Sequence, residues 1–391
     1  MHFLHRFLPL PLLAALALSA TPAPAEDDAS QKITAALQPF VDRHTLAGAV
    51  ALVATKDKVL AVATAGFADI AAQKAMAPDA IFWIASQSKP ITASALMMLV
   101  DEGKVNVEDP VEKYLPEFRG QMVIAEQDDN HMLLKKPTHP VKVREILSHT
   151  SGFRFSSPME QPTLDGLPLR DAVRSHALLP LQWEPGTKYQ YSNAGITTAA
   201  RIIEVVSGMA FEDFLAKRLF EPLGMKDTTF WPSEAQVARI AKSYKPNATK
   251  DGLEETTVGQ LTYPLTDRTH RYPMPAGGLF STAQDVARFC QMILSGGELD
   301  GRRYLSAAAV KQMTTKQTGD EIKDGYGFGW STGGQTFGHG GAFATNMNID
   351  AGRGLITVWM VQHAGFPGDG GQSNGAFVQA AQAAFPSVAG K

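Results

Sequence analysis

Ser86-Gln87-Ser88-Lys89-Pro90 opens a long apolar segment, residues 91–102. This segment is apolar around most of its circumference, which is typical of a helix that is buried on all sides. Pro90 has no backbone N–H to donate and therefore belongs near the start of that helix. Because residues three apart share one helical face, the Ser86 hydroxyl and the Lys89 amine are expected to touch.

A serine at this place has two chemical advantages. Free N–H groups and the positive end of the helix dipole gather at a helix start, where they stabilise a developing oxyanion. A lysine among apolar neighbours has a lowered pKa, so the Lys89 amine can act as a base toward Ser86. The same short pattern also fits a capping serine beside a solvent-exposed lysine, so the interpretation depends on further motifs.

Two further motifs carry polar groups at places where a ligand could approach. Tyr191-Ser192-Asn193 comes directly before a predicted helix over residues 194–206. The tyrosine could be only a packing ring, and the asparagine only a helix cap. Gly338-His339-Gly340-Gly341 follows an apolar run, and glycines beside a strand let a ligand or another backbone come close. A tight turn is the alternative for these glycines.

Taken together, these three motifs resemble the serine β-lactamase and penicillin-binding protein superfamily. The stretches 147–152, 220–225 and 276–282 resemble the same superfamily, so the likeness covers most of the chain. The resemblance implies that Ser86 is the acylated nucleophile and that Lys89 accepts its proton. Tyr191 would be the second acid/base group and would deliver a proton to the leaving group.

The resemblance also implies substrate-binding roles for several groups. Asn193 would be a polar clamp on the acyl side of the substrate. The backbone N–H groups of Ser86 and Ala342, beside Gly341, would form the oxyanion hole. His339 stands where many members carry the lysine of a Lys-Thr-Gly motif, and this departure puts β-lactam hydrolysis in doubt. A His-x-Gly pattern at this place is similar to D-amino-acid-specific aminopeptidases and other members that are not β-lactamases.

The charge of the residue at position 339 bears on substrate choice. A histidine with an ordinary pKa is mostly neutral at pH 7, whereas a lysine is fully charged. A neutral donor binds a substrate carboxylate more weakly than a charged donor does. We therefore expect His339 to favour neutral esters over penicillins. The alternative is that His339 only packs against the sheet and that Arg154 binds the carboxylate.

Strands are predicted near both ends of the chain. Residues 48–53 and 59–65 are apolar, β-prone runs around a short charged turn, which is typical of a hairpin. Residues 343–349 and 355–361 predict a second hairpin, and an alanine-rich helix is expected over 375–385.

The middle of the chain is mainly helical, with signals over 91–102, 194–206 and 211–220. A small hairpin is expected within residues 122–134. Residues 244–278 show no clear helical or strand period in their apolar residues, so this segment is expected to line a site or form a lid. These patterns predict an α+β fold, in which N- and C-terminal strands form one antiparallel sheet flanked by helices, with a large helical insertion.

The expected boundaries follow from this arrangement. A single domain is expected over residues 26–388, with an α/β lobe over about 30–90 and 280–388 and a helical lobe over about 91–279. Residues 1–25 have a weakly basic start, an apolar stretch and a small-x-small site, which predict a cleaved signal peptide and an exported protein. An uncleaved membrane anchor is the alternative; after cleavage we expect no stable membrane insertion.

Several other functions are disfavoured by composition and spacing. The net charge is −3 and no long basic run is present, so nucleic acid is not an expected partner. The histidines lack metal-ligand spacing, and neither a metal nor another cofactor is expected. The single cysteine, Cys290, is interpreted as a small buried hydrophobe. Ser373 lies in a Gly-x-Ser-x-Gly pattern, but no histidine follows it, as an α/β-hydrolase would require.

The leading hypothesis is thus an exported serine hydrolase that cleaves esters or small amides, such as a carboxylesterase. The alternatives are a D-amino-acid-specific peptidase or β-lactamase and, in a different class, an acylated sensor with little turnover. The expected partner is a small ester, amide or short-peptide substrate, and the sequence gives no oligomeric state.

Overall fold

The computed structural model describes residues 28–386. The predicted signal peptide, residues 1–25, lies outside the described residues. No single helix within residues 28–386 is long and apolar enough to cross a membrane, although α5 (Asn193–Ser207) and the helical stretch Phe211–Leu223, bent by 79°, pass that test as a pair.

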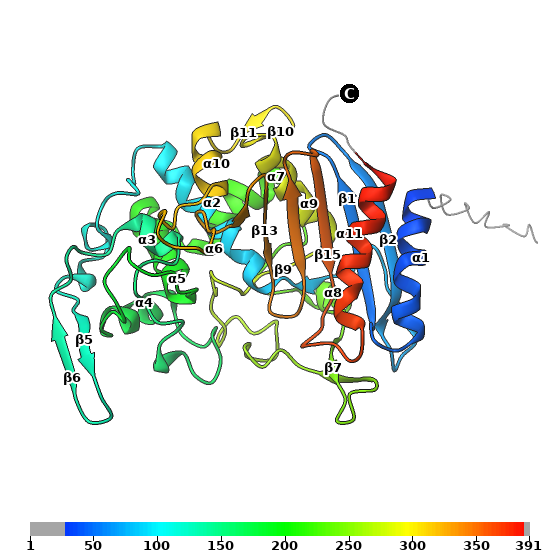
Figure 1. Cartoon of the computed structure of the whole chain (residues 1–391), viewed down its shortest axis with the longest axis horizontal. Helices are drawn as coiled ribbons and strands as arrows, with labels where there is room; N and C mark the ends of the chain where they lie inside the picture. Colours follow the sequence, from blue (N-terminus) through cyan, green and yellow to red (C-terminus); the bar gives the residue numbers. More distant parts are fainter. Residues whose placement is uncertain (1–27, 387–391) are drawn as a thin grey trace, which may run out of the picture.

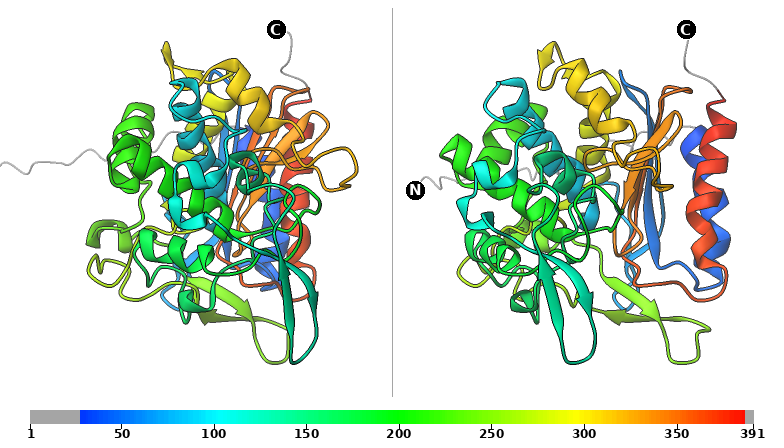
Figure 2. Two further views of the ribbon diagram at one scale, coloured as in Figure 1. Left: turned by 90° about the vertical axis from the view of Figure 1, so that its left-hand side faces the viewer. Right: turned by 60° about the vertical axis from the view of Figure 1, so that its left-hand side comes forward.

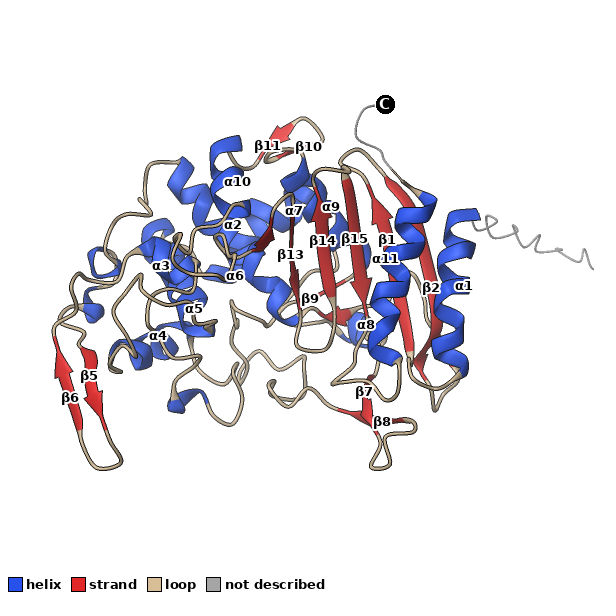
Figure 3. Cartoon of the chain, in the orientation of Figure 1, coloured by secondary structure: helices blue, strands red, loops and turns tan. Residues whose placement is uncertain are grey.

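The described part of the chain contains one seven-stranded sheet, with the strand order β12-β13-β14-β15-β1-β2-β3 (Figure 3). Strands from the two ends of the chain meet in its middle, where β1 pairs with β15 in antiparallel fashion and Leu52 lies opposite Val358. This confirms the predicted α+β architecture. The strands are β1 (Gly48–Ala54), β2 (Val59–Asp69), β3 (Lys74–Ala75), β12 (Ser331–Gly333), β13 (Thr336–Gly340), β14 (Asn346–Asp350) and β15 (Leu355–Met360).

Strand β1 is buried along its whole length, because both faces of the sheet are covered. Val50 and Leu52 point into the larger core, whereas Ala51 and Val53 point into the smaller one, as the two-residue period of a strand requires. The smaller core lies under α1 (Asp28–Asp42) and α11 (Ser373–Ala384), which run side by side on one face (Figure 1).

The opposite face of the sheet carries α9 (Ala283–Leu294) and, beyond it, the helical region (Figure 2). At the centre of that region lies α2 (Ser88–Asp101), in which every residue from Ser88 to Leu99 is buried. Further helices are α3 (Val143–Leu147), α4 (Leu169–Ala177), α5 (Asn193–Ser207), α6 (Phe211–Leu215), α7 (Glu221–Leu223), α8 (Glu234–Val237) and α10 (Ala307–Thr314).

Short hairpins and turns complete the fold. The two-stranded pairs are β4 (Phe82–Trp83) with β9 (Phe280–Ser281), β5 (Val123–Gln127) with β6 (Met132–Lys135), β7 (Ser243–Pro246) with β8 (Leu253–Thr256), and β10 (Glu298–Leu299) with β11 (Arg302–Arg303). The pair β5–β6 is the hairpin predicted within residues 122–134, and it projects from the helical region (Figure 1).

Several boundaries differ from the prediction, among them the following three. Helix α2 begins at Ser88 rather than at residue 91. The helix expected over 211–220 changes to a π-helical turn at Ala216–Phe220. Strand β14 begins at Asn346 rather than at residue 343, because the N–H of Gly341 donates to the carbonyl of Thr345 and the chain turns there.

Candidate active site

Ser86 lies in η1 (Ala85–Gln87), a 3-10 turn between strand β4 and helix α2. Ala85 has a φ of 47°, a left-handed conformation that non-glycine residues adopt only where their surroundings hold them. The strand before it is fixed, because the indole Nε1 of Trp83 donates to the carbonyl of Gly277 over 2.6 Å. Ser86 therefore precedes the buried helix directly, close to the predicted position.

The amine of Lys89 is buried in the same place, and the side chain has 0% exposure. Its Nζ lies 3.0 Å from Ser86 Oγ, 2.8 Å from Asn193 Oδ1 and 2.8 Å from the carbonyl oxygen of Ala276. Burial lowers the pKa of this amine well below its ordinary value. Among the described residues, no carboxylate lies within ion-pair distance to oppose that effect.

These three contacts fit a neutral amine. Such an amine has two N–H donors and one lone pair. Asn193 Oδ1 and the Ala276 carbonyl oxygen accept hydrogen bonds and cannot donate them, so they take the two N–H groups of Lys89. An ammonium would donate a third N–H to Ser86 Oγ over the same distance, whereas a neutral amine leaves its lone pair for the hydroxyl of Ser86, which is the arrangement that removal of the Ser86 proton requires.

Tyr191 covers the same amine from another side. Lys89 Nζ lies 4.5 Å from the centre of the Tyr191 ring. Burial raises the pKa of the Tyr191 phenol above its ordinary value, and a hydrogen bond with Ser86 opposes this only in part. The phenol therefore keeps its proton at neutral pH, so Tyr191 is suited to donate a proton and Lys89 to accept one.

Asn193 is the first residue of α5, and it reaches Lys89 because α5 packs against α2, the helix that carries Lys89, as well as against α3. The hydroxyl of Ser192 caps this helix by accepting the N–H of Gly195 over 3.3 Å. A Cβ atom on Gly195 would lie 2.5 Å from the carbonyl oxygen of Ile146, so only glycine permits this helix contact.

His339 lies on β13 but is turned away from the cavity beside Ser86. The side chain is buried, and its Nδ1 lies 2.7 Å from the carbonyl oxygen of Gly340, so Nδ1 carries the proton. Its Nε2 consequently accepts from the hydroxyl of Tyr326 over 3.0 Å. Burial lowers the pKa of His339 to about 3. The ring is neutral, as expected, but both nitrogens are already used within the protein.

Gly341 and Ala342 lie at the edge of the cavity beside Ser86. A Cβ atom on Gly341 would lie 2.2 Å from Thr345 Oγ1 and 2.7 Å from the Ile84 carbonyl oxygen, which explains the glycine at this point. Among the described residues, the N–H of Ala342 has no acceptor. That free donor fits the oxyanion-binding role that the sequence suggested.

The cavity beside Ser86 has a volume of about 280 Å³. Its described lining carries aromatic, apolar and amide groups and no charged side chain. The lining residues are Trp83, Ala85, Ser86, Phe155, Tyr191, Asn193, Gln260, Met274, Gly277, Gly340, Gly341 and Ala342. Arg154, the alternative carboxylate-binding cation, lines a different and much smaller cavity beside His176.

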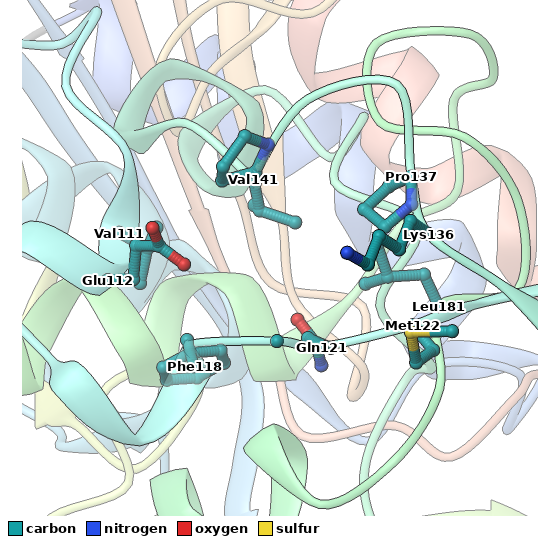
Figure 4. Close-up of a pocket in the computed structure, with 11 residues that line it drawn as sticks. Val111, Glu112, Phe118, Gln121, Met122, Lys136, Pro137, Val141 and Leu181 are labelled. Carbon is teal, nitrogen blue, oxygen red and sulfur yellow. The ribbon is translucent and has the colours of Figure 1, made fainter.

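A second cavity, of about 300 Å³, lies near the base of the β5–β6 hairpin (Figure 4). Val111, Phe118, Val141 and Leu181 supply most of its apolar wall, and Lys136 lies at its side. None of the candidate catalytic residues lines it. We therefore identify the cavity beside Ser86 as the candidate active site on chemical grounds.

Three groups near Lys89 had no assigned role in the sequence analysis. His149 and Tyr326 are buried and form an aromatic cluster with Tyr191 and His339. Burial lowers the pKa of His149 well below its ordinary value. His149 belongs to the family-like stretch 147–152, which was the available signal. Ala276 belongs to the family-like stretch 276–282, but its side chain gives no sign of the contact, because any residue type has a backbone oxygen.

The remaining sequence candidates are explained structurally. Ser373 is buried at the start of α11, where its hydroxyl donates to the carbonyl of Gly370 over 2.6 Å, and it does not line the cavity. Cys290 is buried, and burial raises the pKa of its thiol. Within residues 28–386, no cluster of three or more His, Cys, Asp or Glu side chains could hold a metal ion.

Comparison with known proteins places this geometry in a family. The beta-lactamase family model matches residues 33–382, and the chain belongs to that family. It is similar to Protein Rv1367c of Mycobacterium tuberculosis, with 32% identity over 84% of this chain and 89% of that protein. It is also similar to Esterase EstB of Burkholderia gladioli, with 28% identity over 76% and 78% of the two chains.

A solved structure supports the fold. EstCE1, described as a hydrolase with promiscuous acyltransferase activity, superposes with a TM-score of 0.74 at 23% identity and covers 90% of this chain and 98% of that chain. The family and its relatives together support a serine hydrolase.

Proposed function

We propose that this protein is a carboxylesterase-type serine hydrolase that cleaves neutral acyl esters through an acyl-enzyme on Ser86. The observation that carries the substrate class is the lining of the cavity, which has no charged side chain among the described residues. A penicillin or a peptide C-terminus presents a carboxylate, and burying it without a cation is costly. A neutral ester has no such group to desolvate.

The first half of the proposed reaction follows from the contacts of Ser86. Its hydroxyl proton passes to the lone pair of Lys89, and Oγ attacks the ester carbonyl carbon. The carbonyl oxygen becomes an oxyanion and is stabilised by the free N–H of Ala342 and the N–H of Ser86. Collapse of this intermediate breaks the bond to the alcohol and leaves the acyl group on Ser86.

The leaving alcohol needs a proton, and Tyr191 is placed to supply it. Its phenol is protonated and hydrogen-bonded with Ser86, so it faces the reacting bond. The ammonium of Lys89, which received the serine proton, then restores the phenol, and no net proton is lost. Deacylation repeats the sequence with water in place of Ser86: water gives a proton to Lys89 and attacks the acyl carbon, the bond between the acyl carbon and Oγ breaks, and Tyr191 gives its proton to Oγ. The ammonium of Lys89 then restores the phenol.

The test is a matched substrate panel. We expect p-nitrophenyl acetate and butyrate to be turned over with a kcat/KM at least tenfold above that for benzylpenicillin. Ser86→Ala should lose about 10⁴-fold or more in kcat, whereas Ser373→Ala, the matched control, should keep wild-type activity. Intact-mass analysis should place the acyl group on the peptide that contains Ser86.

Three outcomes would contradict the proposal. A kcat/KM for benzylpenicillin above that for the esters would point to a β-lactamase or peptidase. An acyl-enzyme that forms but does not turn over would point to a sensor. Labelling of Ser373 would remove Ser86 as the nucleophile.

We also propose that the protein is exported and that cleavage follows Ala25. The support is the basic start, apolar stretch and small-x-small site within residues 1–25. N-terminal sequencing of protein recovered outside the cytoplasm should begin near Glu26. Membrane-bound protein that retains residues 1–25 would show an anchor instead.

A further inference from the structure

One wall of the candidate active site comes from a segment with little regular structure. Gln260 and Met274 both line the cavity, and the chain between them has no strand or α-helix. Backbone without a ladder of hydrogen bonds must be anchored by other groups if it is to hold a fixed shape. The position of this wall therefore depends on what holds residues 260–274.

The anchor is a buried ion pair. Arg271 Nε donates to Asp165 Oδ2 over 2.7 Å, and the two side chains are 2% and 1% exposed. The other oxygen, Oδ1, accepts from both the N–H and the hydroxyl of Thr262, at 2.8 and 2.9 Å. Arg271 Nη1 also donates to the carbonyls of Phe230 and Leu265. One ion pair thus fixes both ends of the segment.

The pair lies close in sequence to the residues that line the cavity. Thr262 is two residues from Gln260, and the carbonyl of Gln260 accepts the N–H of Leu164, the neighbour of Asp165, over 2.9 Å. Arg271 is three residues from Met274, and the N–H of the next residue, Tyr272, donates to the Asp165 carbonyl over 2.8 Å. A displacement of the pair would therefore move both Gln260 and Met274.

A buried ion pair contributes little net free energy to the stability of the segment that it anchors. The desolvation of two charges offsets most of their attraction, and well-packed apolar side chains are often as stabilising. What a buried pair can add is a single defined arrangement. Here that arrangement is the wall of the cavity beside Ser86.

We propose that Asp165 and Arg271 are positioning residues that fix Gln260 and Met274 and so set the size of the acyl group that the cavity admits. This proposal rests on the proposed esterase function, and it names the part of the protein that selects among neutral acyl groups. Neither Asp165 nor Arg271 lines the cavity, so both act only through the wall.

The contacts of the catalytic amine are secured separately. Ala276, whose carbonyl accepts from Lys89, is flanked by two further anchored carbonyls. Thr92 Oγ1 donates to the Pro275 carbonyl over 2.8 Å, and Trp83 Nε1 donates to that of Gly277. Release of the wall should therefore change acyl selectivity more than it changes the chemical step.

The test compares Asp165→Asn with Asp285→Asn. Asp285 is also a buried carboxylate that accepts one backbone N–H and one threonine hydroxyl, from Asp227 and Thr228, but these residues do not line the cavity. We expect the ratio of kcat/KM for p-nitrophenyl octanoate to that for the acetate to rise at least tenfold in Asp165→Asn. The same ratio should change less than twofold in Asp285→Asn.

A second variant covers the case in which Asp165→Asn does not fold. The double variant Asp165→Leu/Arg271→Met replaces the charges with apolar groups of similar size and removes the hydrogen bonds to Thr262, Phe230 and Leu265. It should show the same rise in the ratio. An unchanged ratio in the folded variants, with only a lowered Tm, would reduce the pair to a structural role and overturn the proposal.

A second readout separates this proposal from the esterase proposal. Methyl and octyl fluorophosphonates label an activated serine without any need for turnover, and intact mass gives their rates at Ser86. Release of the wall should raise the octyl rate relative to the methyl rate by at least tenfold. A wild-type protein that labels but hydrolyses no ester would refute the esterase function, while the labelling ratio would still decide the role of the pair.

Discussion

At the scale of single residues, Lys89 decides how Ser86 reacts in the proposed mechanism. Its amine is buried against Asn193, Ala276 and the Tyr191 ring, and burial lowers its pKa. A neutral amine accepts a proton, whereas an ammonium has no lone pair to do so. Turnover should therefore fall as the pH drops through the lowered pKa of Lys89.

The corresponding variant is Lys89→Arg, whose guanidinium carries a fixed positive charge and cannot be deprotonated. We expect a loss of about 10²–10⁴-fold in kcat for p-nitrophenyl acetate. Lys89→Met is the matched neutral control and should be equally inactive but fully folded, as judged by circular dichroism. If Lys89→Arg kept a tenth of wild-type kcat or more, another group would have to take the serine proton.

His339 gives a second prediction at this scale. A charge at this position can affect carboxylate binding only if the side chain reaches the substrate, but the His339 ring is turned toward Tyr326 and Gly340. His339→Lys would bury an ammonium near Lys89, so we expect the Tm to fall without a gain in kcat/KM for benzylpenicillin. His339→Gln, which adds no charge, is the control. A tenfold gain on benzylpenicillin at an unchanged Tm would show that residue 339 faces the substrate.

At the scale of elements, the catalytic groups depend on how closely α5 approaches α3. Gly195→Ala would place a methyl group 2.5 Å from the Ile146 carbonyl oxygen, so α5 must shift and Asn193 must move with it. We expect a loss of about 1–3 kcal/mol in unfolding free energy, with a lowered kcat. Urea denaturation and ester kinetics measure the two effects.

The control for that substitution is Gly375→Ala in α11, where an added Cβ meets no atom within 4 Å. Alanine is the better helix former, so this variant should gain up to about 1 kcal/mol. Equal effects of the two substitutions would show that the contact between α3 and α5 does not limit stability.

The secondary-structure elements also show which parts of the fold could be predicted from the sequence. Hairpins such as β5–β6 and the buried helix α2 were predictable because their signals lie within one short window. The start of β14 was misplaced because the bond from Gly341 to Thr345 turns the chain there, and the apolar run gives no sign of that bond. The hairpins at the two ends of the chain predicted one antiparallel sheet, but not that β1 pairs with β15, because no local pattern joins strands about 300 residues apart.

Within the candidate site, too, contacts between residues close in sequence were predictable and contacts between distant residues were not. The spacing of Ser86 and Lys89 predicted their contact, which the structure shows at 3.0 Å. The orientation of His339 was not predictable, because it depends on Tyr326, which reaches it from outside the glycine motif. The Asp165–Arg271 pair joins residues 106 positions apart, and no local pattern marks such a partner.

At the scale of the whole molecule, buried histidines make stability depend on pH. Burial lowers the pKa of His339 to about 3, and those of His176 and His363 to about 4. Unfolded histidines have a pKa of about 6.5, so below that pH the unfolded chain binds more protons than the folded one. The contribution of these histidines to the free energy of unfolding is therefore fully present above about pH 6.5 and is lost as the pH falls toward 4.

Glu160 acts in the opposite direction. Burial raises its pKa to about 7, so its contribution to stability is present in acid and is lost as the pH rises through about 7. Burial also lowers the pKa of His149 well below its ordinary value, and it raises those of Glu145, Glu212 and Asp285 less than that of Glu160. The four histidines therefore outweigh the carboxyls, and we expect a lower unfolding free energy at pH 5 than at pH 7. Urea denaturation at the two pH values measures the difference.

His363 is the residue with which to test that cause. Its Nε2 accepts the N–H of Ala47, so protonation there would break the bond. His363→Gln should reduce the pH dependence, whereas the same change at the exposed His131 should leave it unaltered. Equal stability of the wild type at pH 5 and pH 7 would remove the basis of this prediction.

The position of β1 between β2 and β15 has a consequence for synthesis. During translation β1 emerges roughly 300 residues before β15, which is a delay of about 15–60 s at about 5–20 residues per second. Throughout that interval one edge of an entirely apolar strand has no partner and is open to aggregation. The sheet can be completed only after β15 has been synthesised, so we expect this protein to fold largely after translation. Until then, β1 of the nascent chain must be protected from aggregation.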